Sequence, residues 1–530
     1  MSESYFAEDE AWRPAGNRWL IAATVTMGAF MELLDTAIIN VSLPQIAGSL
    51  SIGVNEATWV ITAYLVANGI VIPVSGWLST VFGRKRYFLM SLGLFTLSSM
   101  LCGISASLPQ LIIFRLAQGL SGGGLQTTMQ TILLDTFGFR DRPKALTLVM
   151  ATAVSAPAIG PILGGFITDH MSWRWLFLIN LPVGIVTCLA VAALVDDPPW
   201  EKRITAKGAA PIDYVGLILL AIGFGVLQYV LDRGEEFGWF DSTSICLMTA
   251  LSLSAILAVF VWFREKNKPL LGLSPLSNRN FLLGCVISGA TIAPFFATNV
   301  QLPQLVEADF GYTAQLSGLL LSPGPIATLL TLVLLSNPAF KMSHHTRLIL
   351  GLVIMGTCLF QIGRISPDVD YPTLVTIRFF QGAADAFAFL PLNILTYATL
   401  SRDQLRDATC LFAMLRNIVG SASVSVTTAW IVERSQTHMA DLSQHLTPFD
   451  PAFAQATDRS SAALTAIGMT PAGAAAATQG QFYHSLIQQS SLLAYLDIFQ
   501  VMGLMAIAVI PVAILFKPLT SASHQAVAVH

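Results

Sequence analysis

Fourteen apolar stretches, each long enough to cross a lipid bilayer as a helix, divide this chain of 530 residues. A membrane helix needs about 20 apolar residues. With 54% hydrophobic and 11% charged residues, the chain is too apolar for a water-soluble globule with one core. The sequence predicts an all-α integral membrane protein with helices near residues 19–45, 57–79, 87–106, 109–131, 146–168, 175–195, 212–231, 243–263, 281–305, 315–336, 347–365, 372–398, 408–432 and 492–516.

The arginines and lysines predict which side of the membrane each loop faces. If the amino terminus is cytoplasmic, 20 of the 28 basic residues fall in inside segments and 5 in outside loops. Cytoplasmic loops are enriched in Lys and Arg, so both termini are expected in the cytoplasm. The one long outside segment, 433–491, is rich in Ala, Gln, Ser and Thr. Short amphipathic helices and a mobile loop are equally compatible with that composition.

A short motif occurs twice, at the same depth in two predicted helices. The stretches "FRLAQGLSGG" (114–123) and "IRFFQGAADA" (377–386) lie 263 residues apart and share Arg, Gln and Gly at one spacing. Duplicated helical bundles around a central cavity are typical of transporters. We therefore expect a cytoplasmic segment at 1–18, a six-helix bundle at 19–195, a linker with two additional helices at 196–280, a second six-helix bundle at 281–516 and a cytoplasmic tail at 517–530.

Six charged residues fall within the predicted membrane helices. They are the acids Glu32, Asp35 and Asp385 and the bases Arg115, Arg378 and Arg416. Each costs about 2.5–3.5 kcal/mol at mid-membrane, so it is expected to face a cavity or a partner. Glu32 and Asp35, three positions apart, share nearly one helix face and can face one cavity. A carboxylate there can take up a proton on one side of the membrane and release it on the other.

The alternative is that each acid pairs with an arginine and holds helices together. Asp385 favours a functional role, because its counterpart in the first copy of the repeat is Gly122. A structural ion pair that was duplicated with the bundle would not predict that asymmetry. For the three arginines, a structural role toward backbone carbonyls or an acid and a role in proton coupling remain equally open.

Two glycine-rich motifs are expected to serve conformational change. The stretch "GWLSTVFGRKRYF" (76–88), which begins at Gly76, is expected to make a tight inside loop, in which Gly83 allows a sharp turn and Arg84 and Arg86 can reach helix carboxyl ends and anionic lipid. In "SAPAIGPILGGF" (155–166), small residues and prolines suit an interface that opens and closes, although ordinary close packing would use the same residues. The residues that we select there are Gly160, Pro161, Gly164 and Gly165.

Polar and aromatic residues within the helices are candidates for lining a drug-sized cavity. They are Tyr64, Asn68, Gln126, Phe295, Asn299, Phe387 and Asn393. No metal-ligand cluster and no nucleotide-binding loop stands out in the sequence. We therefore expect no cofactor and, if transport is active, an ion gradient as its energy source. The net charge of −3 gives no reason to expect a nucleic-acid partner.

The motifs together resemble those of the major facilitator superfamily, specifically its fourteen-span drug:proton antiporters of the EmrB/QacA type. The resemblance rests on "LLDTAIINVSLPQIA", "TWVITAYLVANGIVIPVSGWL", "FRLAQG", "GPILGG" and "SWRWLFLINLPVGI", and it covers nearly the whole chain. It implies two six-helix bundles that carry two inserted helices. It also implies proton-coupled multidrug efflux across a bacterial inner membrane, with Asp35 as the family's first-span acid and Arg115 as its fourth-span arginine.

Three further stretches, "LDRGEEFGWF", "SNRNFLLGC" and "PFDP…GMT", resemble the EmrB subgroup. The resemblance implies a periplasmic adaptor of EmrA type and an outer-membrane channel of TolC type as partners. Thr80 stands where the family's loop motif carries an aspartate, and Glu32 stands where the family is not generally acidic. Cationic substrates are the simplest explanation for Glu32. The alternatives are a proton-coupled exporter or importer of one metabolite and, with less support, an intramembrane enzyme.

Overall fold

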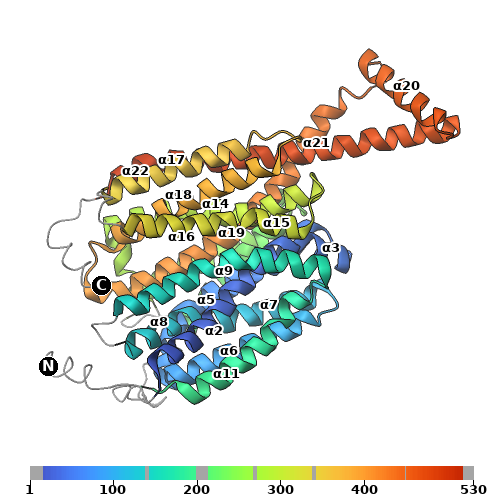
Figure 1. The fold of residues 1–530 in the computed structure, drawn as a ribbon. Coiled ribbons are helices and arrows are strands. Elements are labelled where there is room, and N and C mark those ends of the chain that lie inside the picture. The colour runs from blue at the N-terminus through green and yellow to red at the C-terminus, as the bar shows by residue number, and fades with distance from the viewer. Residues whose placement is uncertain are drawn as a thin grey trace, which may run out of the picture.

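The computed structural model describes residues 16–137, 142–197, 213–266, 271–336, 342–447 and 449–516 (Figure 1). The described chain is almost entirely helical. Its elements are α2 (Arg18–Ile39), η1 (Asn40–Ser42), α3 (Leu43–Leu50), α4 (Val54–Ala57), α5 (Trp59–Phe82), α6 (Arg84–Gly103), α7 (Leu108–Gly122), α8 (Leu125–Thr136), α9 (Arg142–His170), α10 (Trp175–Leu178), α11 (Asn180–Leu194), α12 (Tyr214–Arg233), η3 (Trp239–Asp241), α13 (Thr243–Glu265), η4 (Ser274–Ser277), α14 (Arg279–Ala308), α15 (Ala314–Leu321), α16 (Pro323–Ser336), α17 (His344–Ile362), α18 (Tyr371–Tyr397), α19 (Arg402–Ser443), α20 (Pro451–Ala466), α21 (Pro471–Ala508) and α22 (Ile510–Ile514).

Each predicted membrane helix overlaps one observed helix or two to three consecutive helices. Within the described ranges, eleven of these segments are long and apolar enough to cross a membrane. The segments outside that set are α6, the pair α7 and α8, and α18. Helix α6 begins with the basic turn, and α18 carries Arg378 and Asp385, so both are less apolar than the other segments. The pair α7 and α8 is interrupted near Gly123, so neither helix alone is long enough. The prediction of an all-α membrane protein is confirmed.

Two packed groups of helices, related by the sequence repeat, form the body of the molecule (Figure 1). The N-terminal half, α2 to α11, packs around a core that contains Phe88, Phe95 and Phe177. The C-terminal half, α14 to α22, packs around Leu359, Phe499 and their neighbours. The halves meet where α5 packs on α19 and where α9 packs on α15.

The inserted helices α12 and α13 pack against each other at the periphery of the bundle. Their shared core includes Leu220, Val259 and Phe263 and continues onto Phe281 of α14 and Phe412 of α19. At one end, the Asp213 carboxylate accepts hydrogen bonds from the Trp262 indole and the Lys266 ammonium, which ties α12 to α13. Because α12 also contacts α5, the inserted pair lies where the two halves meet.

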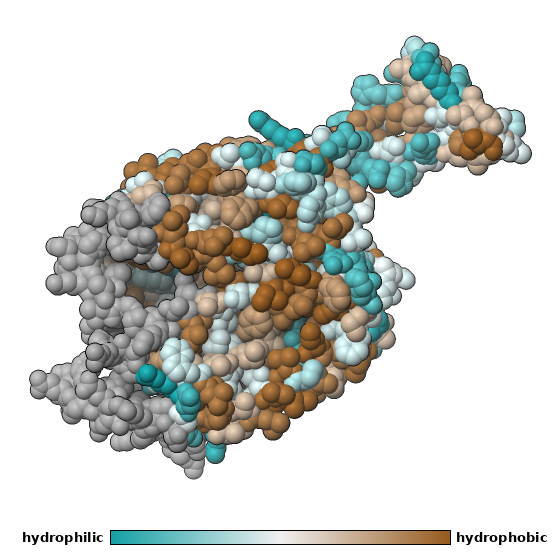
Figure 2. Space-filling model, viewed as in Figure 1, coloured by the Kyte–Doolittle hydropathy of each residue, from teal (hydrophilic) through white to brown (hydrophobic). Residues whose placement is uncertain are grey.

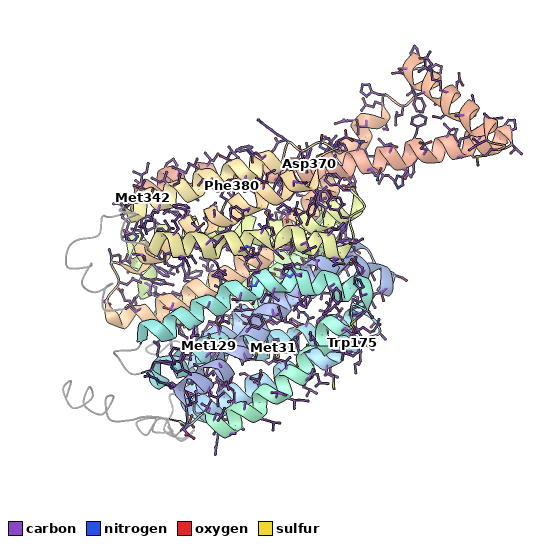
Figure 3. All side chains as sticks on the ribbon, viewed as in Figure 1. Met31, Met129, Trp175, Met342, Asp370 and Phe380 are labelled. Carbon is purple, nitrogen blue, oxygen red and sulfur yellow. The ribbon has the colours of Figure 1, made fainter. Side chains whose placement is uncertain are left out.

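The face of the helical body that Figure 2 shows is largely apolar. Side chains such as Val186 (66% exposed), Leu257 (66%) and Val333 (71%) would meet water in a soluble protein but meet acyl chains in a bilayer. Trp175, at the predicted outer end of its helix, and Asp370, in a predicted outside loop, are at one end of the bundle, and Met342, in a predicted inside loop, is at the other end (Figure 3). This arrangement agrees with the predicted order of the loops.

The long segment 433–491, predicted to lie outside, is largely helical where the structure describes it, so the mobile-loop alternative is wrong. Helix α19 continues to Ser443, α20 folds back, and α21 begins at Pro471, well before the predicted start of the last membrane helix at 492. The three form an arm that projects from the bundle (Figure 1). Asp450 and Thr470 cap the two helix starts, and the Ala-rich sequence favours helix. Residues 1–15 of the predicted cytoplasmic segment 1–18, part of the linker 196–280 and the tail 517–530 lie outside the described residues.

Candidate functional site

Asp35 lies inside the N-terminal half, with its side chain fully buried. Its Oδ2 is 2.5 Å from Nη1 of Arg115, and its Oδ1 accepts hydrogen bonds from Nε2 of Gln118 (2.9 Å) and Nδ2 of Asn180 (2.8 Å). Helices α2, α7 and α11 thus supply the acid, the base and the amides. Both carboxylate oxygens are satisfied, so Asp35 is held in an ion pair in this conformation.

Arg115 is equally enclosed. Its Nε donates to the Val60 carbonyl at 2.8 Å, its Nη1 donates to Oε1 of Gln118 at 2.8 Å, and its guanidinium lies 4.3 Å from the centre of the Tyr64 ring. Buried Arg–carboxylate pairs of this kind fix the geometry of the helices that carry them. The arrangement matches the structural alternative for Arg115, and it leaves a coupling role untested.

Glu32 occupies a different environment from Asp35, although both lie on α2. Its Oε1 accepts hydrogen bonds from the Tyr64 hydroxyl (3.0 Å) and from Nδ2 of Asn68 (3.1 Å), whereas its buried Oε2 has no hydrogen-bond partner within the described part of the chain. A Cβ at Gly122 would lie 3.3 Å from Cγ of Glu32, so this glycine leaves room for the carboxylate. Glu32 is therefore buried but only half satisfied.

The Glu32 site reaches the C-terminal half through Asn68. Oδ1 of Asn68 accepts a hydrogen bond from Nδ2 of Asn417 on α19 at 2.7 Å. Arg416, the preceding residue, attracts Glu32 electrostatically, and no hydrogen bond joins it to any other described residue. Glu32 thus lies where the halves meet. Glu32 and Asp35 have different hydrogen-bond partners in this conformation, because residues three apart on a helix still differ by about 60° in direction.

The second copy of the motif has the same geometry around its arginine. Nη1 of Arg378 donates to Oε1 of Gln381 at 2.9 Å, as Arg115 does to Gln118, and Nη2 donates to Oδ1 of Asn299 at 2.8 Å. Nε2 of Gln381 donates to the Thr298 hydroxyl at 3.3 Å. Thr298 lies 263 residues after Asp35. The duplicated site therefore keeps its arginine and glutamine but has a neutral hydroxyl in place of the acid.

Asp385 is the acid that only the second half contains. It is 4% exposed, and it makes no hydrogen bond or ion pair with any described residue. Arg378, seven positions earlier on α18, attracts it electrostatically but bonds to Asn299 and Gln381 instead. The alternative of a structural ion pair therefore does not describe Asp385 in this conformation.

The remaining residues predicted to line a cavity are dispersed. Phe295 packs edge-on against Phe389 at 6.0 Å, and Asn393 donates within its own helix to the Phe389 carbonyl at 2.8 Å. Gln126 and Phe387 are half-buried. No described hydrogen bond joins Gln126 to Glu32, Asp35 or Asp385. Of the seven predicted lining residues, Tyr64 and Asn68 thus meet at Glu32, and Asn299 joins the Arg378 cluster.

The glycine-rich motif of α9 packs against two different neighbours. A Cβ at Gly160 would be 2.7 Å from the Ala37 Cβ, and one at Gly164 would be 2.4 Å from the Ile38 carbonyl oxygen, so both face α2. A Cβ at Gly165 would be 2.2 Å from the Ala314 carbonyl oxygen of α15. Gly318 of α15 approaches the Pro161 carbonyl in the same way. The backbones of α9 and α15 are therefore in contact, and they close the interface between the halves where these two helices meet.

Substituting Gly318 with alanine is expected to force α9 and α15 apart, because the new Cβ would lie 2.0 Å from the Pro161 carbonyl oxygen. The interface between the halves should then open where α9 meets α15. The measurement is the rate of maleimide labelling at Gln45→Cys, a position that bonds across the halves to Glu307 at 3.0 Å. Labelling should be at least several-fold faster than in the parent background. Gly289→Ala, whose Cβ would meet open space, should leave the rate unchanged.

The inside turn contains Gly83 with a φ of +84°, a conformation that glycine adopts without strain. Arg84 forms an ion pair with Asp135 at the end of α8, and Arg86 is exposed. Gly76 has open space around its Cβ position. The predicted contact of Arg84 with a helix carboxyl end is therefore made through a side chain of that helix.

Sequence reasoning missed three residues of these clusters, Asn180, Asn417 and Thr298. Each is a polar residue in an otherwise apolar helix, and Asn417 directly follows Arg416. The 263-residue offset, applied to Asp35, would have identified Thr298. Asn180 and Asn417 carry no comparable signal, because their partners are far away in the sequence.

Comparison with known proteins shows the family. A family model described as Major Facilitator Superfamily matches residues 25–424. The multidrug export protein EmrB of Escherichia coli (strain K12) is 35% identical over 442 residues, which cover 83% of this chain and 85% of that protein. The fatty acid resistance protein FarB of Neisseria gonorrhoeae is 30% identical over 498 residues, 94% of this chain and 96% of that protein.

Solved structures support the fold. A D-xylose-proton symporter aligns with a TM-score of 0.60 at 13% identity over 95% of this chain and 98% of its own. An inward-facing bacterial homologue of the human lysosomal transporter Spinster aligns with a TM-score of 0.58 at 14% identity over 95% and 98%. The family match, the relatives and the fold together show that this chain is a multi-pass membrane protein that belongs to the Major Facilitator Superfamily and is EmrB-like within it.

Proposed function

We propose that this protein is a proton-coupled exporter of small amphipathic compounds, a drug:proton antiporter. It would act in the inner membrane of a bacterium with both termini in the cytoplasm. The names of two relatives, a multidrug export protein and a fatty acid resistance protein, support amphipathic substrates. The proposal needs no cofactor and makes the protein a transporter rather than an enzyme.

The observation that carries this proposal is the incomplete satisfaction of two buried acids, one in each half. Glu32 has a buried oxygen with no described partner, and Asp385 bonds to no described residue. An ionised carboxylate in such a place carries a large desolvation cost. A proton or a cationic substrate would remove that cost. Each acid is therefore suited to exchange a bound proton for a cationic substrate.

The exchange would follow from alternation between two conformations. Glu32 lies at the contact between the halves, where Asn68 bonds to Asn417, so rocking of the halves changes its surroundings directly. In the state open to the cytoplasm, the ionised acid attracts substrate. In the outward-open state, a proton from the more acidic side neutralises the acid, and the substrate leaves.

The proton gradient is sufficient for this work. One charge moving through 100 mV gains about 2.3 kcal/mol, and one pH unit adds about 1.4 kcal/mol. Because a tenfold concentration ratio requires about 1.4 kcal/mol, one proton per cycle supports a gradient of tenfold or more.

We further propose that export continues beyond the inner membrane through a periplasmic adaptor of EmrA type and an outer-membrane channel of TolC type. The arm formed by the end of α19, α20 and the start of α21 extends from the end that we assign to the periplasm (Figure 1). Protons, amphipathic substrates, lipid and these two proteins are then the partners, and nucleic acid is not among them.

Transport by purified protein in proteoliposomes tests the proposal. A pH gradient, acidic on the side that corresponds to the periplasm, should drive planar cationic dyes or weak-acid uncouplers toward that side against their concentration gradients. A protonophore should stop the movement. If transport persists after Glu32, Asp35 and Asp385 are all neutralised, these acids do not couple protons and the mechanism is wrong.

Glu32→Gln is expected to reduce efflux of cationic dyes at least tenfold while leaving the fold intact. The amide oxygen can still accept the bonds from Tyr64 and Asn68, but the negative charge that attracts a cation is lost. The measurement is the KM for a cationic dye and for a weak acid in proteoliposomes. Equal losses for both substrate classes would mean that Glu32 does not select for charge.

A further inference from the structure

The last turn of α12 joins the two halves through a network of hydrogen bonds. Oδ2 of Asp232 accepts from the Thr62 hydroxyl of α5 (3.1 Å) and from Nε2 of Gln228 (3.0 Å). The Gln228 side chain in turn contacts the hydroxyls of Ser421 and Ser425 on α19. One acid of the inserted pair is thus tied to the N-terminal half and, through Gln228, to the C-terminal half.

A cavity of about 20 Å³ lies at this junction. Its lining comes from α4, the N-cap of α5, the end of α12 with the turn that follows, and α19, and consists of Asn55, Thr58, Asp232, Glu235, Ser425, Thr428, Ala429 and Val432. A space of this size holds one water molecule or one small ion and excludes any drug-sized compound. None of its lining residues contacts Glu32 through a described hydrogen bond, so the cavity is separate from the Glu32 site.

The cavity presents oxygen atoms that are free to coordinate. Oδ1 of Asp232 is shielded from solvent and has no hydrogen-bond partner within the described ranges. The Thr58 hydroxyl uses its proton on the Asn55 carbonyl at 2.6 Å, so its lone pairs remain available. A buried carboxylate oxygen without a partner costs several kcal/mol, and a bound cation removes that cost. Carboxylate and hydroxyl oxygens are ligands that hard cations prefer.

The surroundings of the cavity are acidic. Glu235 and Glu236 follow Asp232 on the chain, and Glu433 faces Glu235 from α19. Partial burial, together with these two glutamates, raises the pKa of Glu235. Arg233, a base that follows Asp232 on the chain, bonds to Glu56 of α4 and to Glu236. The electrostatic field at the cavity mouth therefore attracts cations.

We propose that this cavity is a second cation site, which holds one small monovalent cation, either sodium or a hydrated proton, between α5, α12 and α19. A divalent ion is a poorer fit, because magnesium keeps several waters and calcium takes six to eight ligands. The bound cation would hold the two halves together where α5, α12 and α19 meet. The inserted pair would thereby gain a role that the duplicated bundles lack, whichever substrate the protein transports.

Thermal unfolding of the full-length protein in detergent tests this site. Sodium chloride replaces choline chloride at constant ionic strength, and separate scans are run from pH 8 to pH 6. We expect the preferred cation to raise the melting temperature saturably, by about 2–4 °C. Asp232→Asn removes the charge, whereas Ala429→Val keeps the charge and fills the cavity. Both variants should lose the effect.

The sodium comparison and the pH scans distinguish the two cations. A sodium-specific rise identifies sodium, and a rise at low pH without a sodium effect identifies the proton. Asp241→Asn, an exposed acid at the same end that does not line the cavity, should respond like the parent. The proposal is overturned if neither condition shifts the parent, or if Asp232→Asn and Ala429→Val respond as the parent does. If Asp232→Asn does not fold, Ala429→Val alone decides the result.

Discussion

Replacing Asp35 with asparagine is expected to abolish proton-coupled efflux and also to destabilise the protein by about 3–5 kcal/mol. Asp35 is the charge partner of a fully buried arginine, at 2.5 Å, and it accepts two further hydrogen bonds from Gln118 and Asn180. An amide would leave Arg115 without a counter-charge and would turn an NH2 group toward donors. The measurement is the melting temperature in detergent, together with efflux in proteoliposomes.

A double variant separates the two effects of Asp35→Asn. Adding Arg115→Met removes the uncompensated charge, so the melting temperature should recover in large part. Efflux should remain absent if Asp35 also carries protons. Recovery of both properties would mean that Asp35 serves only to neutralise Arg115, and an unchanged melting temperature in the single variant would contradict the ion pair itself.

The sequence predicted the membrane helices and the duplication because both depend on local patterns. Apolar runs of about 20 residues identify membrane helices wherever they pack, and the repeated Arg, Gln and Gly identify the two halves. The structure shows the same bond from Arg115 to Gln118 and from Arg378 to Gln381, at 2.8 and 2.9 Å. Within each motif the partner lies three residues away, so sequence reasoning can find it.

The separation of Glu32 from Asp35 could not be predicted in the same way. Their spacing indicates one helix face, but the groups that decide their environments come from distant helices. Asn180 lies 145 residues from Asp35, and Asn417 lies 349 residues from the Asn68 side chain that contacts Glu32. Asp232 was missed because it lies one residue beyond the predicted end of its helix, where an acid is expected to be solvated.

The sequence left the helical arm undecided for a different reason. Alanine, glutamine and serine occur in mobile loops and in helices alike, so composition left both alternatives open. Capping residues decide between them locally: Asp450 accepts from the Ala452 and Phe453 amides, and Thr470 accepts from the Gly473 amide. Each precedes a proline at the first helical position, a pattern that favours helix starts.

Asp385→Asn is expected to give the opposite combination from Asp35→Asn: an unchanged melting temperature and a loss of pH-gradient-driven efflux of at least tenfold. Asp385 bonds to no described residue, so its replacement by an amide breaks no described hydrogen bond or ion pair. Removing a buried charge that has no partner can even stabilise the fold. What disappears is a group that can bind and release a proton within the second half.

The control for Asp385 is an acid on the same helix. Asp370→Asn alters an exposed residue at the start of α18 (Figure 3), and it should leave efflux unchanged. Asp385→Glu, which restores a titratable carboxyl, should recover part of the gradient dependence, whereas a role in packing alone would not be restored by a longer side chain. A drop in melting temperature for Asp385→Asn as large as that for Asp35→Asn would show that Asp385 is paired with Arg378 after all. Each half would then contain a structural pair of an arginine and an aspartate, and Glu32 alone would remain as the acid free to exchange protons for substrate.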